Sequence, residues 1–271
     1  MIVSVIGLGF VGGSMLKSFQ IKNVNVLGYD KYKKNTNSFE ECLESQIMFL
    51  CLPTVFDNTT KQYDKSCIVE TLEKLKENNY QGLIVNKSTV EPETDKILVD
   101  QYPMLKLVHN PEFLTAVTAF EDFHNQSHIV LGITKNVNED DIETLKTFYS
   151  ELYPNAELSI CDSTESESMK IFCNCFYAMK VQIFNEFYLL CQKNDCDYKR
   201  VVELMLKNKW INPMHTNVPG PDGQLSYGGY CFPKDTNALL QHMKNKDSPH
   251  DVLEACVNER NNMRDDNTNC K

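Results

Sequence analysis

The chain has 271 residues, and its 37 acidic side chains outnumber 27 lysines and arginines, which gives a net charge of −10. This balance argues against a protein that binds the nucleic-acid backbone, and no apolar run reaches the ~18 residues of a membrane span. The length allows two domains of ordinary size.

The cysteines predict a reducing environment. There are eleven, an odd number, at irregular spacings, which is typical of reduced thiols in a cytoplasmic protein. The apolar stretch 1–15 is interrupted by glycines and has no basic leader, so we do not expect a signal peptide. The segments 173–175 and 191–196 lack the spacing and the histidines of a zinc site, so we expect no metal.

The first elements form a nucleotide-binding pattern. A β-branched run at 2–6 predicts a buried strand, followed by a glycine turn at 7–12, a helix to about residue 20 and a second strand at 24–29. Glycines in such a turn let a pyrophosphate approach the helix N-terminus. Asp30 ends the second strand, 18 residues after Gly12, where an acid binds the ribose hydroxyls.

This pattern predicts NAD as the cofactor. Asp30 would repel the 2′-phosphate of NADP, although three nearby lysines weaken that preference. A glycine-rich turn that binds no ligand is the alternative. The predicted cofactor contacts in this segment are Gly7, Gly9, Phe10, Val11, Gly12 and Asp30.

Further strands and helices follow at the rhythm of an open α/β sheet. We expect strands at 46–52, 82–87, 106–109 and 127–133, and helices at 66–78, 91–100 and 139–152. The predicted fold class is therefore α/β, with an N-terminal Rossmann-like doubly wound sheet over residues 1–160.

Polar residues follow three of these strands, where a doubly wound sheet binds its ligands. Pro53-Thr54 and Ser88-Thr89 end two of them, and Asn110–Leu114, which includes Glu112, follows a third. Serine and threonine at such places are often only helix caps. Capping and ligand binding are both open for Thr89.

The second half, 161–271, is predicted to be an all-α central domain. One long helix is expected from about 163 to 193, and Lys170 and Asn174 share one of its faces because they are four residues apart. A solvated lysine on an amphipathic helix is the alternative for Lys170. Shorter helices are expected at 198–207, 234–246 and 250–264, and a long loop at 208–230.

Cys231 lies in the segment Ser226–Asp235, a glycine-flanked turn that continues into Pro233, Lys234 and Asp235. Proline suits the first turn of a helix, and a helix N-terminus favours a thiolate over a thiol. Most free cysteines are small buried hydrophobes, which is the alternative. The setting favours a reactive thiol.

The motifs together resemble the nucleotide-sugar 6-dehydrogenases of the UDP-glucose/GDP-mannose dehydrogenase family, and its UDP-glucose members most. The matching segments span nearly the whole chain in the family's order: 7–12 with Asp30, 49–54, 88–90, 110–114 with 118–119, Glu167-x-x-Lys170-x-x-x-Asn174, 185–186 and 228–235. The resemblance implies an NAD-dependent oxidation of a sugar's C6 alcohol to a carboxylate, UDP-glucose to UDP-glucuronate, in a cytoplasmic homodimer built on the long helix.

The resemblance also implies the roles of individual residues. Cys231 would form a thiohemiacetal and then a thioester, Lys170 and Asn174 would stabilise oxyanions, and Glu112 would activate the hydrolytic water. The implied catalytic residues are Cys231, Lys170, Asn174, Asp235, Glu112 and Thr89. Pro53, Thr54, Thr89 and Lys234 would contact the cofactor. The implied substrate contacts are Glu112, Phe113, Leu114, Lys170, Asn174, Tyr227 and Gly228.

Three departures from the family's pattern leave alternatives open. Ala116 stands where the family usually has a second glutamate, the segment after Asp30 is short, and the sequence ends after the central helices, without the family's C-terminal domain that grips the base. A dehydrogenase of GDP-mannose or of a UDP-N-acetylhexosamine is the nearest alternative. A non-catalytic protein that binds NAD or a sugar nucleotide is the alternative from another class.

Overall fold

The computed structural model describes residues 1–115, 117–264 and 266, and the chain forms two compact units. Unit 1 comprises Met1–Thr54 and Asp64–Lys170, and unit 2 comprises Val55–Tyr63 and the described part of Ile171–Lys271. The predicted domains, 1–160 and 161–271, stay a prediction. The compact units differ from that division by a short hairpin and by the start of the long helix.

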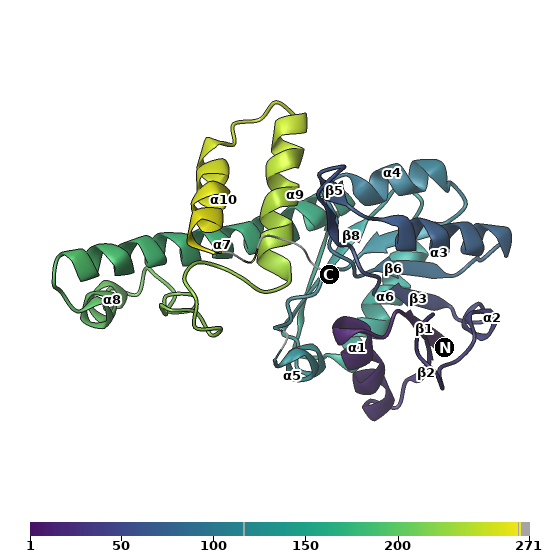
Figure 1. Cartoon of the computed structure of the whole chain (residues 1–271). Coiled ribbons are helices and arrows are strands. Elements are labelled where there is room, and N and C mark those ends of the chain that lie inside the picture. The colour runs from purple at the N-terminus through teal and green to yellow at the C-terminus, as the bar shows by residue number, and fades with distance from the viewer. Residues whose placement is uncertain (116, 265, 267–271) are drawn as a thin grey trace. The chain divides into compact units, whose positions relative to one another are not determined.

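Unit 1 is built on a seven-stranded sheet with the strand order β2-β1-β3-β6-β7-β8-β9 (Figure 1). The first five strands in that order are parallel, β8 runs antiparallel to β7, and β9 runs parallel to β8. The strands are β1 (Ile2–Ile6), β2 (Asn25–Tyr29), β3 (Ile47–Leu50), β6 (Leu83–Asn86), β7 (Lys106–His109), β8 (His128–Ile133) and β9 (Glu157–Asp162). The chain changes direction across the sheet between β1 and β3, so ligands are expected at the carboxyl ends of these strands.

Helices cover both faces of this sheet. Because alternate strand residues point to opposite faces, Val5 and Phe49 pack in one hydrophobic cluster with Phe19 of α1, whereas Leu50 packs in the other with Leu72 of α3. The helices of unit 1 are α1 (Phe10–Ile21), α2 (Phe39–Cys42), α3 (Ser66–Glu77), α4 (Thr94–Gln101), α5 (Ala119–His124) and α6 (Glu139–Leu152). The predicted Rossmann-like α/β class is therefore confirmed.

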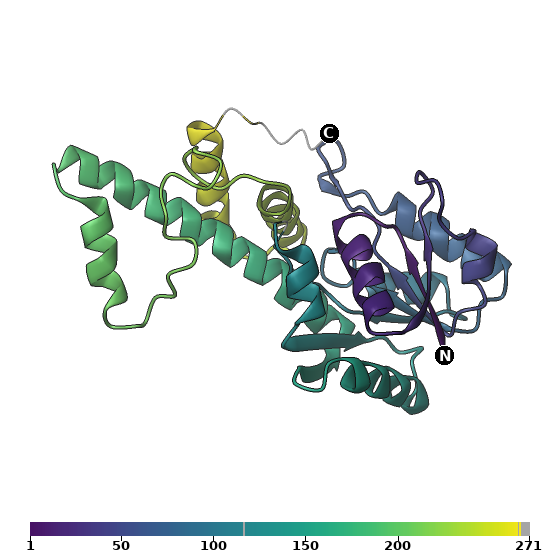
Figure 2. The same ribbon diagram turned by 90° about the horizontal axis from the view of Figure 1, so that it is seen from below.

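Unit 2 contains helices and one hairpin, and this hairpin comes from the first half of the sequence, where it was not predicted. The hairpin pairs β4 (Phe56–Asp57) with β5 (Gln62–Tyr63) and lies between β3 and α3 in the chain. The helices are α7 (Ser163–Lys193), α8 (Tyr198–Leu206), α9 (Cys231–Asn245) and α10 (Asp251–Met263). Figure 2 shows α7 as one uninterrupted helix, which confirms the predicted long helix. No described helix is both long and apolar enough to cross a membrane.

The first turns of α7 belong to unit 1 and bury an acid there. The carboxylate of Glu167 accepts the backbone N–H groups of Glu93 (2.6 Å) and Asp95 (2.7 Å) at the start of α4. Glu167 and Asp95 are both fully buried, and among the described residues Oδ2 of Asp95 has no hydrogen-bond partner. Burial, together with the other carboxyl nearby, raises the pKa of Glu167, and burial raises the pKa of Asp95.

This acid pair should make the protein less stable as the pH rises. Both carboxyls hold a proton more tightly in the folded chain than in the unfolded one, so the stability that this pair contributes is fully present below their ordinary pKa values of 4.5 and 3.8 and is lost as the pH rises above them. We expect the thermal unfolding midpoint to fall between about pH 5.5 and pH 8.5, and Asp95→Asn to reduce that fall by several degrees. Circular dichroism melts at a series of pH values measure this.

Glu151→Gln is the matched control, because Glu151 is an exposed carboxylate on α6 of the same unit. It should keep the pH dependence of the wild type. An Asp95→Asn protein with the wild-type pH dependence would contradict the assignment to the buried pair.

Candidate functional site

The three motif glycines of the turn after β1 meet different surroundings. Gly7 has φ +87°, and a Cβ there would lie 2.5 Å from the carbonyl oxygen of Cys51, while a Cβ on Gly12 would lie 1.9 Å from that of Gly7. A Cβ on Gly9 would meet no atom within 4 Å. Gly7 and Gly12 are therefore required for packing, whereas Gly9 borders open space at the N-terminus of α1, beside the exposed Phe10. This is the arrangement that a dinucleotide pyrophosphate requires.

Asp30 lies at the end of β2 and is oriented by the same turn. Its carboxylate accepts the backbone N–H of Leu8 (2.8 Å) and of Tyr32 (2.9 Å). Partial burial would raise the pKa of Asp30, but these hydrogen bonds and the charge of Lys33 lower it below its ordinary value. The carboxylate is thus held as an anion, the form that accepts hydrogen bonds from ribose hydroxyls.

The ends of β3 and β6 are joined by side-chain hydrogen bonds. Ser88 Oγ donates to the carbonyl oxygen of Leu52 (2.8 Å), and Thr54 Oγ1 donates to the carbonyl oxygen of Thr89 (2.7 Å). The N-cap of α4 is Glu93, so neither Ser88 nor Thr89 is a helix cap. Thr54 is buried and the preceding proline is exposed. Thr89 therefore has no capping role in α4, and it is half-buried at the carboxyl edge of the sheet.

Glu112 and Lys170 meet in unit 1. The ammonium of Lys170 donates to the carbonyl oxygen of Glu112 (2.5 Å) and lies 3.2 Å from its Oε1, while Oε2 accepts the N–H of Leu114 (2.6 Å). Lys170 is 5% exposed and lies 5.4 Å from the ring centroid of Phe113. The alternative of a solvated lysine is therefore wrong. Instead, Lys170 forms a buried ion pair with Glu112, and this pair fixes the segment that follows the carboxyl end of β7.

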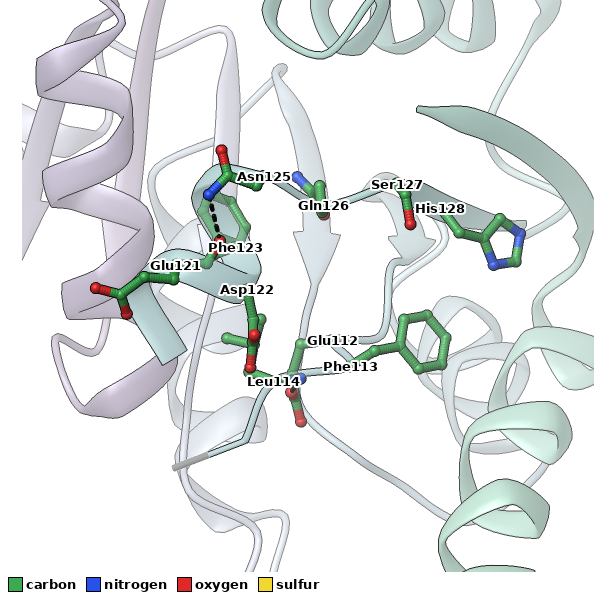
Figure 3. Close-up of a pocket in the computed structure, with 10 residues that line it drawn as sticks. All are labelled: Glu112, Phe113, Leu114, Glu121, Asp122, Phe123, Asn125, Gln126, Ser127 and His128. Carbon is green, nitrogen blue, oxygen red and sulfur yellow. Dashed lines mark hydrogen bonds between the residues drawn. The ribbon is translucent and has the colours of Figure 1, made fainter. Parts of the chain in front are cut away.

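A pocket of about 490 Å³ opens beside this ion pair (Figure 3). Glu112, Phe113 and Leu114 line one side, and the residues that lead into β8 line the other. The ring of Phe113 stacks on His128, with centroids 6.1 Å apart. Because β8 is antiparallel to β7, its start and the end of β7 lie at the same edge of the sheet. The pocket is therefore at the edge where polar residues were predicted to gather.

Asp235 is the centre of a polar cluster in unit 2. It is fully buried in the first turns of α9, and its Oδ2 accepts the side-chain N–H of Asn174 (2.6 Å) while its Oδ1 accepts that of Lys234 (2.6 Å). The thiol of Cys175 donates to its carbonyl oxygen (3.5 Å). Burial alone would lower the pKa of Lys234, but the charge of Asp235 and its hydrogen bond raise it. Lys234 is thus a buried cation paired with Asp235.

Cys231 is the first residue of α9 and is exposed. The helix begins there and not near 234 as expected, so Pro233 lies within the first turn, where its missing N–H costs nothing. The side chain of Cys231 is one helical turn from Asp235. The helix dipole at this position favours the thiolate form, and the alternative of a buried hydrophobic cysteine is wrong.

Two buried arginines from the end of α10 fix the loop that leads to Cys231. Arg260 Nε donates to the carbonyl oxygen of Tyr227 (3.1 Å), and Arg264 Nη1 donates to that of Leu225 (3.1 Å). A Cβ on Gly228 would lie 2.3 Å from the Arg264 guanidinium, which explains the glycine. The Tyr227 side chain is itself buried, so at this position only backbone is available to a ligand.

The predicted site residues divide between the two compact units. Unit 1 contains the glycine turn, Asp30, Pro53, Thr54, Thr89, Glu112–Leu114 and Lys170. Unit 2 contains Asn174, Tyr227, Gly228, Cys231, Lys234 and Asp235. Within the units, Glu112 is paired with Lys170, and Asn174 and Lys234 are paired with Asp235. Their catalytic and binding roles stay predictions. Ala116 lies outside the described residues.

Sequence reasoning missed Arg260, Arg264 and Tyr63, whose hydroxyl donates to Asp235. The sequence offers one signal for the two arginines: they are four residues apart near the end of a predicted helix, so they share a face. Tyr63 carries none, because it lies in a short polar segment between predicted elements.

Two sequence models of one family match most of the chain. Residues 30–153 match the NAD binding domain of the UDP-glucose/GDP-mannose dehydrogenase family, and residues 164–262 match the central domain of the same family. The first match confirms the predicted cofactor, NAD. The glycine turn precedes the matched range, and its geometry fits the same cofactor.

Individual relatives agree with these matches. The chain is 26% identical over 254 residues to a UDP-glucose 6-dehydrogenase of Campylobacter jejuni, covering 92% of this chain and 60% of the relative, and 31% identical over 237 residues to one of Rickettsia bellii, covering 85% and 52%. It thus spans about half to three fifths of their length. A solved UDP-glucose dehydrogenase from Pyrobaculum islandicum has the same fold, with a TM-score of 0.83 at 23% identity over 96% of this chain and 68% of that one.

The surroundings of the glycines predict separable effects on binding and folding. Gly9→Ala should leave the unfolding temperature unchanged but weaken NAD binding at least about tenfold, because its methyl group would occupy the space open to the pyrophosphate. Gly12→Ala is the counterpart that should destabilise the fold, since its Cβ would collide with the carbonyl oxygen of Gly7. Calorimetric titration with NAD and thermal melts measure the two effects. Unchanged NAD affinity in folded Gly9→Ala would place the cofactor elsewhere.

Proposed function

We propose, because this chain belongs to the UDP-glucose/GDP-mannose dehydrogenase family, that it is an NAD-dependent dehydrogenase that oxidises the C6 alcohol of UDP-glucose to the carboxylate of UDP-glucuronate. The observation that carries this proposal is the start of α9. An exposed thiol at the first residue of a helix stands one turn before a fully buried, multiply hydrogen-bonded carboxylate, Asp235. This is the arrangement of a nucleophile supported by a fixed acid–base group.

The proposed reaction has two oxidation steps at the same carbon, and NAD, when bound, supplies the hydride acceptor for each. A water held by Asp235, Thr89 and Lys170 takes the proton of the alcohol as the aldehyde forms. The thiolate of Cys231 then adds to the aldehyde carbon, and the resulting thiohemiacetal loses a hydride and its hydroxyl proton to become a thioester. Water activated by Glu112 adds to the thioester, and the thiolate leaves as the carboxylate is released.

The contacts of Lys170 and Asn174 support their proposed roles. Oxyanions form at the thiohemiacetal and at the hydrolytic step, and fixed donors in a poorly solvated site stabilise them without reorganisation. Lys170 is buried and held by Glu112, and Asn174 is buried and held by Asp235. The two residues are four apart on α7, so the same helix carries both donors.

We further propose that the protein forms a homodimer through α7. One face of this helix exposes a row of large apolar side chains, each 36–64% exposed: Phe172, Phe176, Ile183, Phe187 and Leu190. Their spacing of 4, 7, 4 and 3 residues keeps them on one side of the helix. Such a continuous apolar stripe is typical of an interface, and a second copy of the same helix would cover it around a two-fold axis.

We also propose that the protein works in the cytoplasm. Cys231 must be a thiolate to attack an aldehyde, and ten further cysteines would be at risk of oxidation outside a reducing compartment.

The proposed reaction predicts a stoichiometry. With NAD, the protein should form two NADH per UDP-glucose consumed, and Cys231→Ser should lower formation of the carboxylate at least about a hundredfold. Absorbance at the NADH band and chromatography of the sugar nucleotides measure both. Cys196→Ser, which changes another exposed cysteine, should retain the wild-type rate.

A panel of sugar nucleotides separates the alternatives. Turnover of GDP-mannose or a UDP-N-acetylhexosamine in place of UDP-glucose would retain the chemistry and correct the substrate. NAD binding without turnover of any sugar nucleotide would contradict the proposed reaction and favour a non-catalytic binding protein.

The proposed interface predicts a change of mass. Phe176→Glu places a charge in the middle of the stripe and should convert the dimer to a monomer in sedimentation equilibrium. Ile97→Glu, which changes another exposed apolar residue, on α4, should leave the dimer intact. A wild-type monomer, or a Phe176→Glu dimer, would contradict an interface on α7.

A further inference from the structure

Tyr63 reaches Asp235 from a distant part of the sequence. It is the last residue of the β4–β5 hairpin, and its phenol hydroxyl donates to Oδ1 of Asp235, 172 residues further along the chain. The side chain is 3% exposed and packs in one hydrophobic cluster with Ile171 and Leu239. The hairpin belongs to unit 2, although the segments before and after it in the sequence belong to unit 1.

Tyr63 also contacts Lys234. The ammonium of Lys234 lies 4.5 Å from the centroid of the Tyr63 ring and 2.6 Å from Oδ1 of Asp235. The ring thus supports the lysine by a cation–π contact, while the hydroxyl binds the same carboxylate oxygen as the lysine does. The three side chains form a closed triangle.

The donors are unevenly shared between the two carboxylate oxygens. A carboxylate oxygen accepts about two hydrogen bonds, and Oδ1 receives two, from Tyr63 and Lys234. Oδ2 receives one from a described side chain, Asn174. The carboxylate can therefore neither rotate nor exchange its oxygens without breaking two contacts to Oδ1, and Oδ2 is the oxygen with capacity for a further donor.

We propose that Tyr63 is a positioning residue for the reaction: it anchors Oδ1 of Asp235 so that Oδ2 holds the water that takes the substrate's proton. This inference rests on the proposed function of Asp235 and adds a residue that acts through it. Tyr63 itself touches neither substrate nor cofactor in this role.

Tyr63→Phe is a clean test because it keeps the ring that packs in the core and supports Lys234, and it removes only the hydroxyl. With NAD and UDP-glucose, kcat should fall about tenfold to a hundredfold, as expected for loss of a hydrogen bond to a charged group, while both KM values stay within about threefold. The loss should fall on kcat and not on KM, because the hydroxyl acts through Asp235 on the water that takes the proton and does not contact the substrate.

Tyr198→Phe is the matched control. It removes a buried tyrosine hydroxyl in the same unit, one that donates to the carbonyl oxygen of Thr216 (2.6 Å), so it should cost stability without lowering kcat. A Tyr63→Phe protein with the kcat and KM values of Tyr198→Phe would overturn the proposal.

A second measurement needs no turnover. Tyr63→Phe and Asp235→Asn are combined in a double-mutant cycle, and the unfolding temperature of each protein is measured. Tyr63→Phe should lower the unfolding midpoint by about 2 °C more when Asp235 is present than when it is replaced by asparagine. If the wild type oxidises no sugar nucleotide but the cycle shows this coupling, the proposed reaction fails and the anchoring of Asp235 by Tyr63 stands. Additive effects in the cycle would overturn the anchoring whatever the activity.

Discussion

The complete burial of the Asp235 carboxylate is the constraint on which unit 2 depends. A buried charge costs several kcal/mol unless cations and hydrogen-bond donors surround it. Here the donors come from three places: the neighbouring Lys234, Asn174 on α7 and Tyr63 on the hairpin. The need to satisfy one carboxylate therefore explains why a hairpin from the N-terminal half is part of unit 2. An acid on the surface of α9 would have required none of these partners.

Unit 1 concentrates its buried charges at the carboxyl edge of the sheet. Lys87 follows β6 and is 3% exposed, yet its ammonium donates to the amide oxygen of Asn110 (2.8 Å), and burial lowers its pKa to about 8. Lys170 is buried against Glu112 at the end of β7. Apolar residues at these positions would avoid the free-energy cost of removing a charge from water. The polar groups are therefore better explained by binding and chemistry at this edge than by stability.

The fold was predictable where one physical signal dominated. Central strands are largely apolar runs because both of their faces are buried, and the glycine turn identifies the first crossover. β9 was missed because its residues are partly exposed and mixed in polarity, and the β4–β5 hairpin because strands of two residues show no periodicity. The start of α9 was placed too late, since proline suggested the first helical position although it is tolerated throughout the first turn.

The site was predictable as a set of residues but not as a set of contacts. Motif spacing indicates Glu112, Lys170 and Asp235, yet the pairing of a side chain with a partner 58 or 172 residues away depends on the packing of whole elements. The glycine motif shows the same limit on a smaller scale. Its three glycines are equivalent as letters, but two of them are required by neighbouring backbone and only Gly9 borders space for a ligand. A motif residue can therefore be required for folding or for binding, and the atoms around it show which of these applies.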